Sequence, residues 1–250
     1  MNKFVNFLNF FFHIIYLFHK NRIINYLNKQ ISVKIVFDVG AYRGKFGHSF
    51  KNSRVFFFEP NIFSFKKIKK IEKSHNKYFN IGVGSKREKK KIYILPNDSA
   101  STFKVSNYKS TFRGKFLNFL GQAAFEKNVE IFPLNYFIKK YSLKNIDILK
   151  IDTEGYEEEV LKGITNKNFK KISYIVIEKQ LNKNLYQNYS FKKIEKRLAD
   201  NNFILLKKFK DYLWNYEDHV YKNKYIRKYS KQRTQKKKVW GTWQQNAPFL

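Results

Sequence analysis

Charged side chains surround the end of one apolar segment, Ile146–Ile151. Lys150 and Asp152 flank a single Ile, so on an extended strand both point to one side, and Glu154 follows two residues later. A carboxylate beside a reacting hydroxyl can remove its proton, and carboxylate oxygens are preferred ligands of Mg²⁺. The sequence predicts that Asp152 and Glu154 act as general base or as ligands of a Mg-like divalent ion, with His48 and Glu178 as weaker alternatives. A structural ion pair with Lys150 is the alternative.

A glycine-containing turn follows another apolar segment and runs from Asp38 through Gly40 to Gly44. Glycines in a strand-to-helix turn let the backbone approach a ligand, and the N–H groups that begin a helix favour anions. Glu59 lies 19 residues after Gly40, where an acidic side chain can accept both hydroxyls of a ribose. Together these residues indicate an adenosine-containing cofactor. A glycine turn with an unrelated exposed acid is the alternative.

The turn favours one cofactor over another. A dinucleotide site normally has G-x-G-x-x-G, whereas Tyr42 occupies the second glycine position here. The negative charge of Asp38 repels pyrophosphate but suits the ammonium of the methionine part of S-adenosylmethionine. An NAD-dependent reductase remains the alternative. It would need a Tyr-x3-Lys pair, and the three such pairs are no more than chance gives for 17 Tyr in a Lys-rich chain.

Short apolar segments alternate with helical patterns along the chain, which predicts an α/β fold. The fold expected is a doubly wound, mostly parallel sheet with helices on both faces, and its ligands bind beyond the carboxyl ends of the strands. The predicted strands are Val33–Val39, Arg54–Phe58, Tyr78–Val83, Ile92–Leu95, Val129–Phe132, Ile146–Ile151, Ile172–Ile177, Phe203–Lys207 and Tyr216–Tyr221. The predicted helices are Phe63–Lys73, Leu134–Tyr141, Glu157–Gly163 and Phe191–Asp200.

Composition excludes several protein classes. Of the 250 residues 43% are hydrophobic and 19% aromatic, which excludes a disordered chain. The absence of cysteine excludes a disulfide scaffold and a thiolate metal site, and five histidines make a histidine-built zinc centre unexpected. A formal net charge of +32 predicts adhesion to polyanions. A basic nucleic-acid or membrane-surface binder without catalysis is therefore a second hypothesis, although Arg, the better phosphate reader, is scarce.

Three parts of the chain are distinguished. Residues 1–30 form a hydrophobic helical segment, 31–225 the main domain and 226–250 a basic tail. The apolar stretch Phe4–Phe18 would rise only about 22 Å as a helix, less than the roughly 30 Å hydrocarbon core of a bilayer. It either packs on the domain or lies on a membrane surface. The polar segment Pro96–Asn128 is predicted to be a functional loop or lid.

The motifs together resemble the FkbM-type methyltransferases, S-adenosylmethionine-dependent enzymes with the class I methyltransferase sheet. Lys150-Ile-Asp152-Thr-Glu154-Gly155 is the specific match, and Tyr42 and Arg43 depart from the family by replacing small or polar residues. The other matches are Val36-Phe-Asp38-Val-Gly40-Ala, Phe58-Glu59-Pro60, Asn80-Ile-Gly-Val-Gly84, the Ser-containing segment Asp98–Thr102, and Pro133-Leu134-Asn-Tyr-Phe137.

The resemblance implies a role for each matched residue. Gly40 and Gly44 would form the turn under the cofactor, with Asp38 near the methionine amine. Glu59 would hold the ribose. The strand end from Asn80 to Val83 would border the adenine. The acceptor side would be lined by Lys150, Asp152 and Glu154.

The implied reaction is O-methylation of a hydroxyl on a sugar, a surface glycan or a related metabolite. Nucleic acid is not expected as a specific acceptor, because the acidic turn at Asp152–Glu154 repels a phosphate backbone. We expect a cytoplasmic location, with residues 1–20 as the candidate for peripheral membrane contact.

Overall fold

A computed structural model of the chain describes residues 2–94, 101–103, 125–182, 185–186, 188–211 and 215–225. The basic tail 226–250 and most of the predicted loop Pro96–Asn128 lie outside the described residues.

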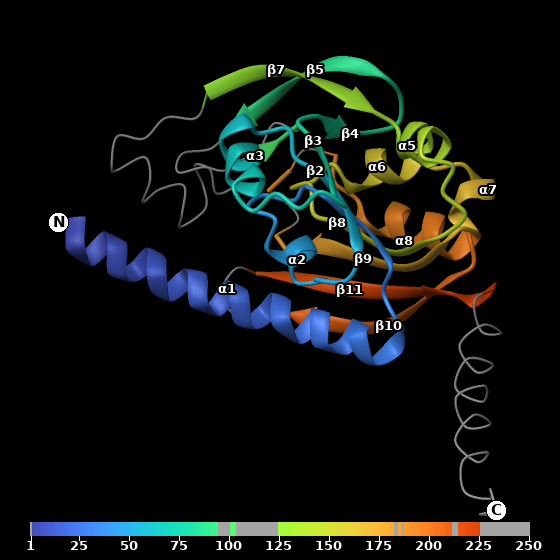
Figure 1. Cartoon of the computed structure of the whole chain (residues 1–250), viewed down its shortest axis with the longest axis horizontal. Helices are drawn as coiled ribbons and strands as arrows, with labels where there is room; N and C mark the ends of the chain where they lie inside the picture. Colours follow the sequence, from blue (N-terminus) through green and yellow to red (C-terminus); the bar gives the residue numbers. More distant parts are fainter. Residues whose placement is uncertain are drawn as a thin grey trace, which may run out of the picture.

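The main sheet has seven strands in the order β10-β11-β9-β8-β1-β2-β3 (Figure 1). Strand β11 runs antiparallel to both of its neighbours, and the other pairs are parallel. The predicted doubly wound, mostly parallel sheet is thereby confirmed. The strands are β1 Ile35–Val39, β2 Arg54–Phe58, β3 Lys77–Phe79, β8 Ile146–Ile151, β9 Ile172–Gln180, β10 Phe203–Lys210 and β11 Tyr216–Asn223.

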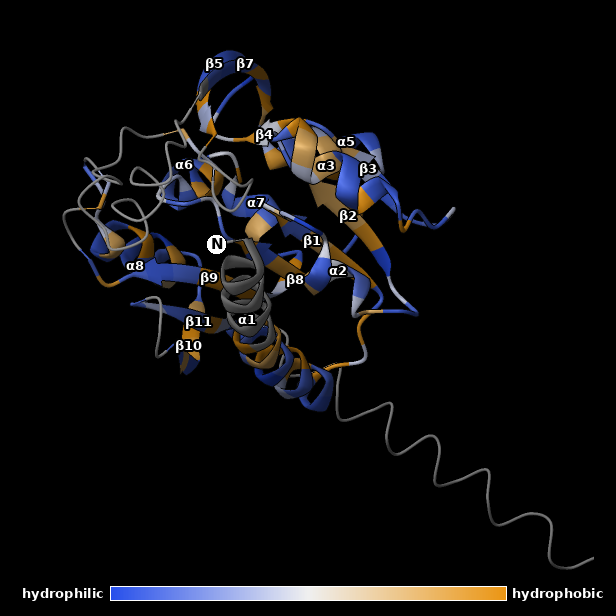
Figure 2. Ribbon diagram, turned by 90° about the vertical axis from the view of Figure 1, so that its left-hand side faces the viewer, coloured by the Kyte–Doolittle hydropathy of each residue, from blue (hydrophilic) through white to orange (hydrophobic). Residues whose placement is uncertain are grey.

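Helices cover both faces of this sheet. Successive side chains of a strand point to opposite faces. On β1, Phe37 and Val39 join one hydrophobic core while Val36 joins the other. The first core lies under α5 Leu134–Lys140, α6 Glu157–Lys162, α7 Asn166–Phe169 and α8 Phe191–Asp200. The second lies under α1 Asn2–Gln30, α2 Lys45–His48 and α3 Ile62–Lys69. In Figure 2 strand β2 is a hydrophobic strand inside the molecule.

A second sheet has the order β4-β7-β5-β6 and consists of β4 Gly82–Val83, β7 Phe125–Phe132, β5 Glu88–Ile94 and β6 Ser101–Thr102. The prediction of one strand over Tyr78–Val83 is therefore wrong, since β3 and β4 belong to different sheets. The side-chain amide of Asn80 donates to the carbonyls of Glu59 (2.8 Å) and Pro60 (3.1 Å), which holds the chain where it leaves the main sheet.

Helix α1 is partly packed and partly projecting. Ile23, Ile24 and Leu27 are buried in the second core, whereas Phe18 is 67% exposed. Figure 1 shows the amino-terminal half of α1 running beyond the edge of the sheet. No helix within the described residues is both long enough and apolar enough to span a bilayer.

The packing of α1 predicts a large difference between two apolar truncations on the same helix. Leu27→Ala should lower the free energy of unfolding by about 2–5 kcal/mol, because Leu27 is fully buried. Phe18→Ala, the matched control, should change it by no more than about 0.5 kcal/mol. Chemical denaturation of the full chain measures both, and equal effects would mean that α1 does not pack as described.

Candidate active site

The ends of β1 and β8 touch at the glycine turn. Gly40 has a φ of +71°, and a Cβ there would lie 1.8 Å from the carbonyl oxygen of Asp152. The amide of Asp152 in turn donates to the carbonyl of Val39 at 3.1 Å. Gly44 also has a positive φ, +72°. The predicted turn therefore needs glycine at both positions, one for close approach and both for backbone conformation.

Tyr42, at the second glycine position, also adopts a left-handed conformation, with a φ of +52°. This conformation is disfavoured for a residue with a side chain. The Tyr42 amide donates to one carboxylate oxygen of Glu59 at 2.7 Å. The turn and the end of β2 are thus joined through the backbone of Tyr42.

Glu59 is 5% exposed and is held at both carboxylate oxygens. Oε2 accepts from the Tyr42 amide and Oε1 from the Asn61 amide at 2.9 Å. Each carboxylate oxygen can accept more than one hydrogen bond, so the carboxylate keeps acceptor capacity for a diol. Burial raises the pKa of Glu59 to about 7, and the two backbone donors act in the opposite direction. The predicted ribose role fits this geometry and stays a prediction.

Lys150 binds three groups at the same strand ends. Its Nζ lies 3.3 Å from Asp38 Oδ1, 3.2 Å from Asp152 Oδ2 and 2.7 Å from the Gly40 carbonyl oxygen. Asp38 is fully buried, and its Oδ2 accepts the Gly47 amide at 3.0 Å. The structural ion pair considered from sequence is therefore present. The expected proximity of Asp38 to the methionine amine stays a prediction.

Glu178, the weaker alternative from the sequence, lies beside the two principal candidates. One oxygen from each of Asp152, Glu154 and Glu178 lies within 4.8 Å of the others, and these three residues are called the acidic cluster below. Glu178, on β9, is 6% exposed. Burial, together with the negative charges of Asp152 and Glu154, raises its pKa well above the usual range. Glu178 is thus the member of the cluster that favours protonation.

The turn that carries Glu154 is fixed from two sides. One oxygen of Glu157 accepts from the Thr153 amide (3.0 Å), the Thr153 hydroxyl (3.1 Å) and the Gly155 amide (3.1 Å). The hydroxyl of Tyr186 donates to Glu154 Oε2. The sequence placed Glu157 only at the start of a predicted helix. In the structure it also holds the turn that carries Glu154.

Contacts from the second sheet reach this turn as well. The Thr102 hydroxyl donates to the Glu154 carbonyl at 2.6 Å, and the side-chain amide of Asn61 donates to the Ser101 hydroxyl at 3.1 Å. Strand β6 thus borders both the Glu59 and the Glu154 turns. Val83 is buried in the core, and the adenine contact predicted for Asn80 and Val83 stays a prediction.

Helix α1 supplies residues that the sequence reasoning missed. Lys20 Nζ lies 2.9 Å from Asp218 Oδ2 and 3.6 Å from Asp152 Oδ2. His19 Nε2 lies 2.8 Å from the same Asp218 oxygen. Burial works against ionisation of Asp218, but Lys20 and His19 hold its pKa below the usual range. The spacing of Lys20 to Ile23, Ile24 and Leu27 is that of one helix face and could have placed Lys20 inside.

The acidic cluster does not fit a divalent cation well, although its oxygen donors are of the right type. Two ammonium groups, Lys20 and Lys150, already lie 3.6 and 3.2 Å from Asp152. Glu154 accepts from the Tyr186 hydroxyl, and Glu178 accepts from the side-chain amide of Gln180 at 2.7 Å. A cation would have to displace these partners, so no step is routed through one below.

The sheet order, the glycine turn after β1 and the acid after β2 define an S-adenosylmethionine-dependent methyltransferase of class I. The sequence profile described as "Methyltransferase FkbM domain" matches residues 38–205, more than half of the chain. The chain belongs to the FkbM methyltransferase family, which confirms the resemblance, the cofactor and the enzyme class expected from sequence.

Three solved structures with similar folds share little sequence with this chain. A magnesium protoporphyrin IX methyltransferase from Synechocystis with bound SAM is 9% identical, with a TM-score of 0.48, over 84% of this chain and 80% of that one. A SAM-dependent methyltransferase from Corynebacterium glutamicum is 10% identical, with a TM-score of 0.41, over 82% and 88%. One from Leishmania major is 10% identical, with a TM-score of 0.42, over 84% and 72%. No curated protein sequence matches significantly.

The pKa of Glu59 predicts a pH-dependent affinity for S-adenosylhomocysteine. If the carboxylate form binds the ribose, protonation below about pH 7 removes acceptors, and the dissociation constant should be about tenfold higher at pH 6 than at pH 8. Calorimetry at pH 6, 7 and 8 measures this. Glu59→Gln, the control, should lack the step; an equally steep dependence in that variant would assign it to another group.

Proposed function

We propose that this enzyme transfers the methyl group of S-adenosylmethionine to a hydroxyl of a sugar, in a surface glycan or a related metabolite. The observation that carries the proposal is the acidic cluster at the carboxyl ends of β8 and β9. Carboxylates accept hydrogen bonds from hydroxyls and can take up the proton that a hydroxyl loses on methylation. Family membership supplies the methyl donor, and the cluster supports the acceptor class.

The chain's own residues have two tasks in this reaction. Bound S-adenosylmethionine supplies an electrophilic methyl group on a positively charged sulfur. Gly40, Gly44 and Glu59 bind and orient it, with Asp38, Asn80 and Val83 in the further contacts that the family pattern implies. Holding the acceptor oxygen in line with the methyl carbon supplies much of the reduction in the barrier.

Asp152 removes the proton from the acceptor. As the new oxygen–carbon bond forms, the carbon–sulfur bond breaks, the sulfur becomes a neutral thioether, and the hydroxyl proton moves to the Asp152 carboxylate. Glu154, fixed by Tyr186, accepts a hydrogen bond from the acceptor. Lys150 holds Asp152 in place. The Mg-like ion considered from sequence has no part here, and methyl transfer in the presence of a chelator is the measurement that bears on it.

Nucleic acid is not the proposed acceptor. The turn at the acceptor side contains Asp152-Thr153-Glu154-Gly155, whose negative charge repels phosphates. The net charge of +32 is summed over the whole chain and supports only general adhesion to polyanions.

The proposal is tested by binding and by turnover on the same samples. Wild type should bind S-adenosylhomocysteine and not NADH in calorimetry, and Glu59→Ala should bind it at least tenfold more weakly. With radiolabelled S-adenosylmethionine and a panel of methyl glycosides, Asp152→Asn should lower kcat by about 10²–10⁴-fold, since it removes the base. Its affinity for S-adenosylhomocysteine should stay near that of wild type.

Two outcomes would contradict this function. Absence of S-adenosylhomocysteine binding in wild type would remove the cofactor assignment. Full activity of Asp152→Asn on a glycoside acceptor would leave the cofactor in place but remove the proposed base.

We also propose that residues 1–20 contact a membrane surface in a cytoplasmic setting. The support is the projecting amino-terminal half of α1, its aromatic sequence and the exposed Phe18 (Figure 1). An apolar helix that lies in the interface binds through its buried apolar area, in addition to any attraction between basic residues and anionic lipids.

Neutral phosphatidylcholine vesicles at high salt separate these two contributions. Wild type should sediment with such vesicles, and replacement of Phe10, Phe11 and Phe12 by Ser should reduce the bound fraction at least tenfold, because apolar insertion is lost. Ile71→Ser, which removes an exposed apolar residue away from α1, is the control and should bind as wild type does. Equal binding of all three proteins would contradict membrane contact through α1.

A further inference from the structure

We propose that Lys20 is the built-in counter-ion of the acidic cluster, with its ammonium taking the place that a divalent cation would take. Helix α1 lies outside the matched residues 38–205, so this makes an element beyond the matched domain part of the catalytic site. Lys20 is a positioning residue that acts through Asp152. The inference rests on the proposed function only for the role of Asp152 as base.

The position of Lys20 follows from the packing of α1. Ile23, Ile24 and Leu27 are buried against the sheet and lie three, four and seven residues after Lys20, on the same helix face. Lys20 is therefore carried into the interior, where it is 3% exposed. An unpaired buried ammonium is very costly, so the fold must provide anions at this place.

The sheet provides those anions from two strands that are not neighbours. Asp218 on β11 lies directly opposite Glu178 on β9, and β8, which ends before Asp152, is the next strand. Lys20 Nζ reaches Asp218 at 2.9 Å and Asp152 at 3.6 Å, and so bridges across β9. His19 contacts Asp218 from α1 as well, at 2.8 Å.

Asp152 has two positively charged partners without a metal ion, and Lys20 is shared with Asp218 and Lys150 with Asp38. The facing groups are two ammoniums and three carboxyls: Lys20 on α1, Lys150 on β8, Glu154 after it, Glu178 on β9 and Glu157 on α6. Two lysines supply the two positive charges of one Mg²⁺. An ammonium only donates hydrogen bonds and cannot bind an acceptor oxygen as a Lewis acid. The carboxylate must then take the acceptor proton by itself.

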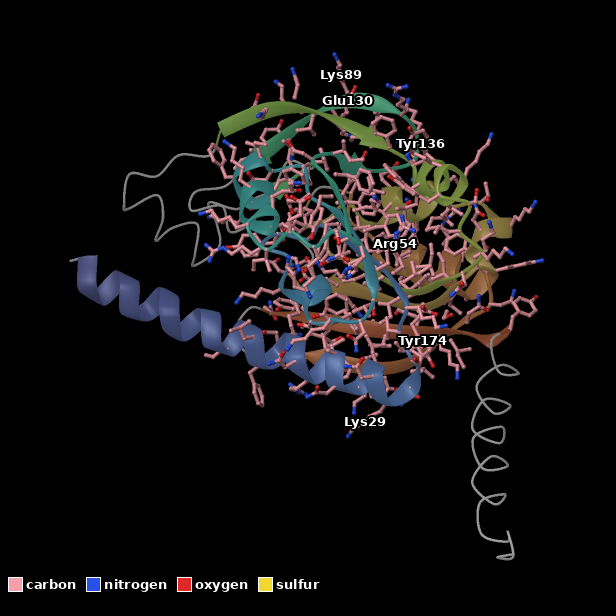
Figure 3. All side chains as sticks on the ribbon, viewed as in Figure 1. Lys29, Arg54, Lys89, Glu130, Tyr136 and Tyr174 are labelled. Atoms are coloured by element: carbon pink, nitrogen blue, oxygen red, sulfur yellow. The ribbon has the colours of Figure 1, made fainter. Side chains whose placement is uncertain are left out.

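Removing the lysine charge should therefore create the metal site that the wild type lacks. The experiment is calorimetric titration of the full chain with Mn²⁺ alone at neutral pH. Lys20→Met should bind one Mn²⁺ per chain at least tenfold more tightly than wild type, and Lys20→Arg, which restores the charge, should behave as wild type. Lys29→Met is the matched control, because Lys29 lies on the same helix but is exposed and points away from the domain (Figure 3).

Two results would overturn the counter-ion role. One is a saturable Mn²⁺ site in wild type that disappears in Asp152→Asn, since the cluster would then be a cation site despite Lys20. The other is a folded Lys20→Met that gains no affinity. If Lys20→Met shows no cooperative thermal unfolding, Lys20→Gln takes its place.

S-adenosylhomocysteine binding, measured on the same proteins, separates this inference from the proposed function. Lys20→Met should keep the wild-type affinity, because Lys20 lies on the acceptor side. Failure of wild type to bind S-adenosylhomocysteine would overturn the function and leave the Mn²⁺ result standing. Metal binding by wild type with intact S-adenosylhomocysteine affinity would overturn only the role of Lys20.

Discussion

The pairing of buried charges at the carboxyl ends of the strands is the constraint on which the site depends. Lys150 is 3% exposed and contacts three groups: Asp38 on β1, the Gly40 carbonyl in the turn after β1, and Asp152 at the end of β8. Breaking one buried pair leaves an uncompensated charge and costs about 3–5 kcal/mol. The glycine turn is therefore fixed by Lys150 from the sheet side and by Glu59 from the side of β2.

The strand register places these groups before any side chain is considered. Asp38 pairs with Lys150 between β1 and β8, and Asp218 pairs with Glu178 between β11 and β9. These four residues lie on the sheet face that carries α1 and α2, since each is two positions along its strand from a residue of the second core: Val36, Ile148, Val176 or Val220. On this face, each of these strands therefore carries a polar side chain next to an apolar core side chain. Helix α1 covers this face, and its His19 and Lys20 contact the polar side chains there.

Local sequence predicted those parts of the fold and site that are local in sequence. Strands Arg54–Phe58 and Ile146–Ile151 and helix Phe191–Asp200 agree with the structure because each is a continuous pattern with clear ends. Glu178 was only a weaker candidate from the sequence, and Asp218 and Lys20 were missed, because strand order and the docking of α1 bring them to the cluster and no short window contains either. Tyr78–Val83 was wrongly predicted because Asn80 turns the chain through hydrogen bonds to a residue 21 positions earlier.

The carboxylates of the cluster have different environments, and this suggests how the work is divided. Glu178 is buried beside two other acids, which raises its pKa and favours a proton on that residue. Asp152 lies between two ammonium groups, with 16% of its side chain exposed. Glu154 is fixed by the hydroxyl of Tyr186. Neighbouring acids with separate environments can hold a proton on one and accept a proton on another, as acid–base chemistry at neutral pH requires. In this arrangement the positive charges of Lys20 and Lys150 offset the repulsion between carboxylates that lie close together.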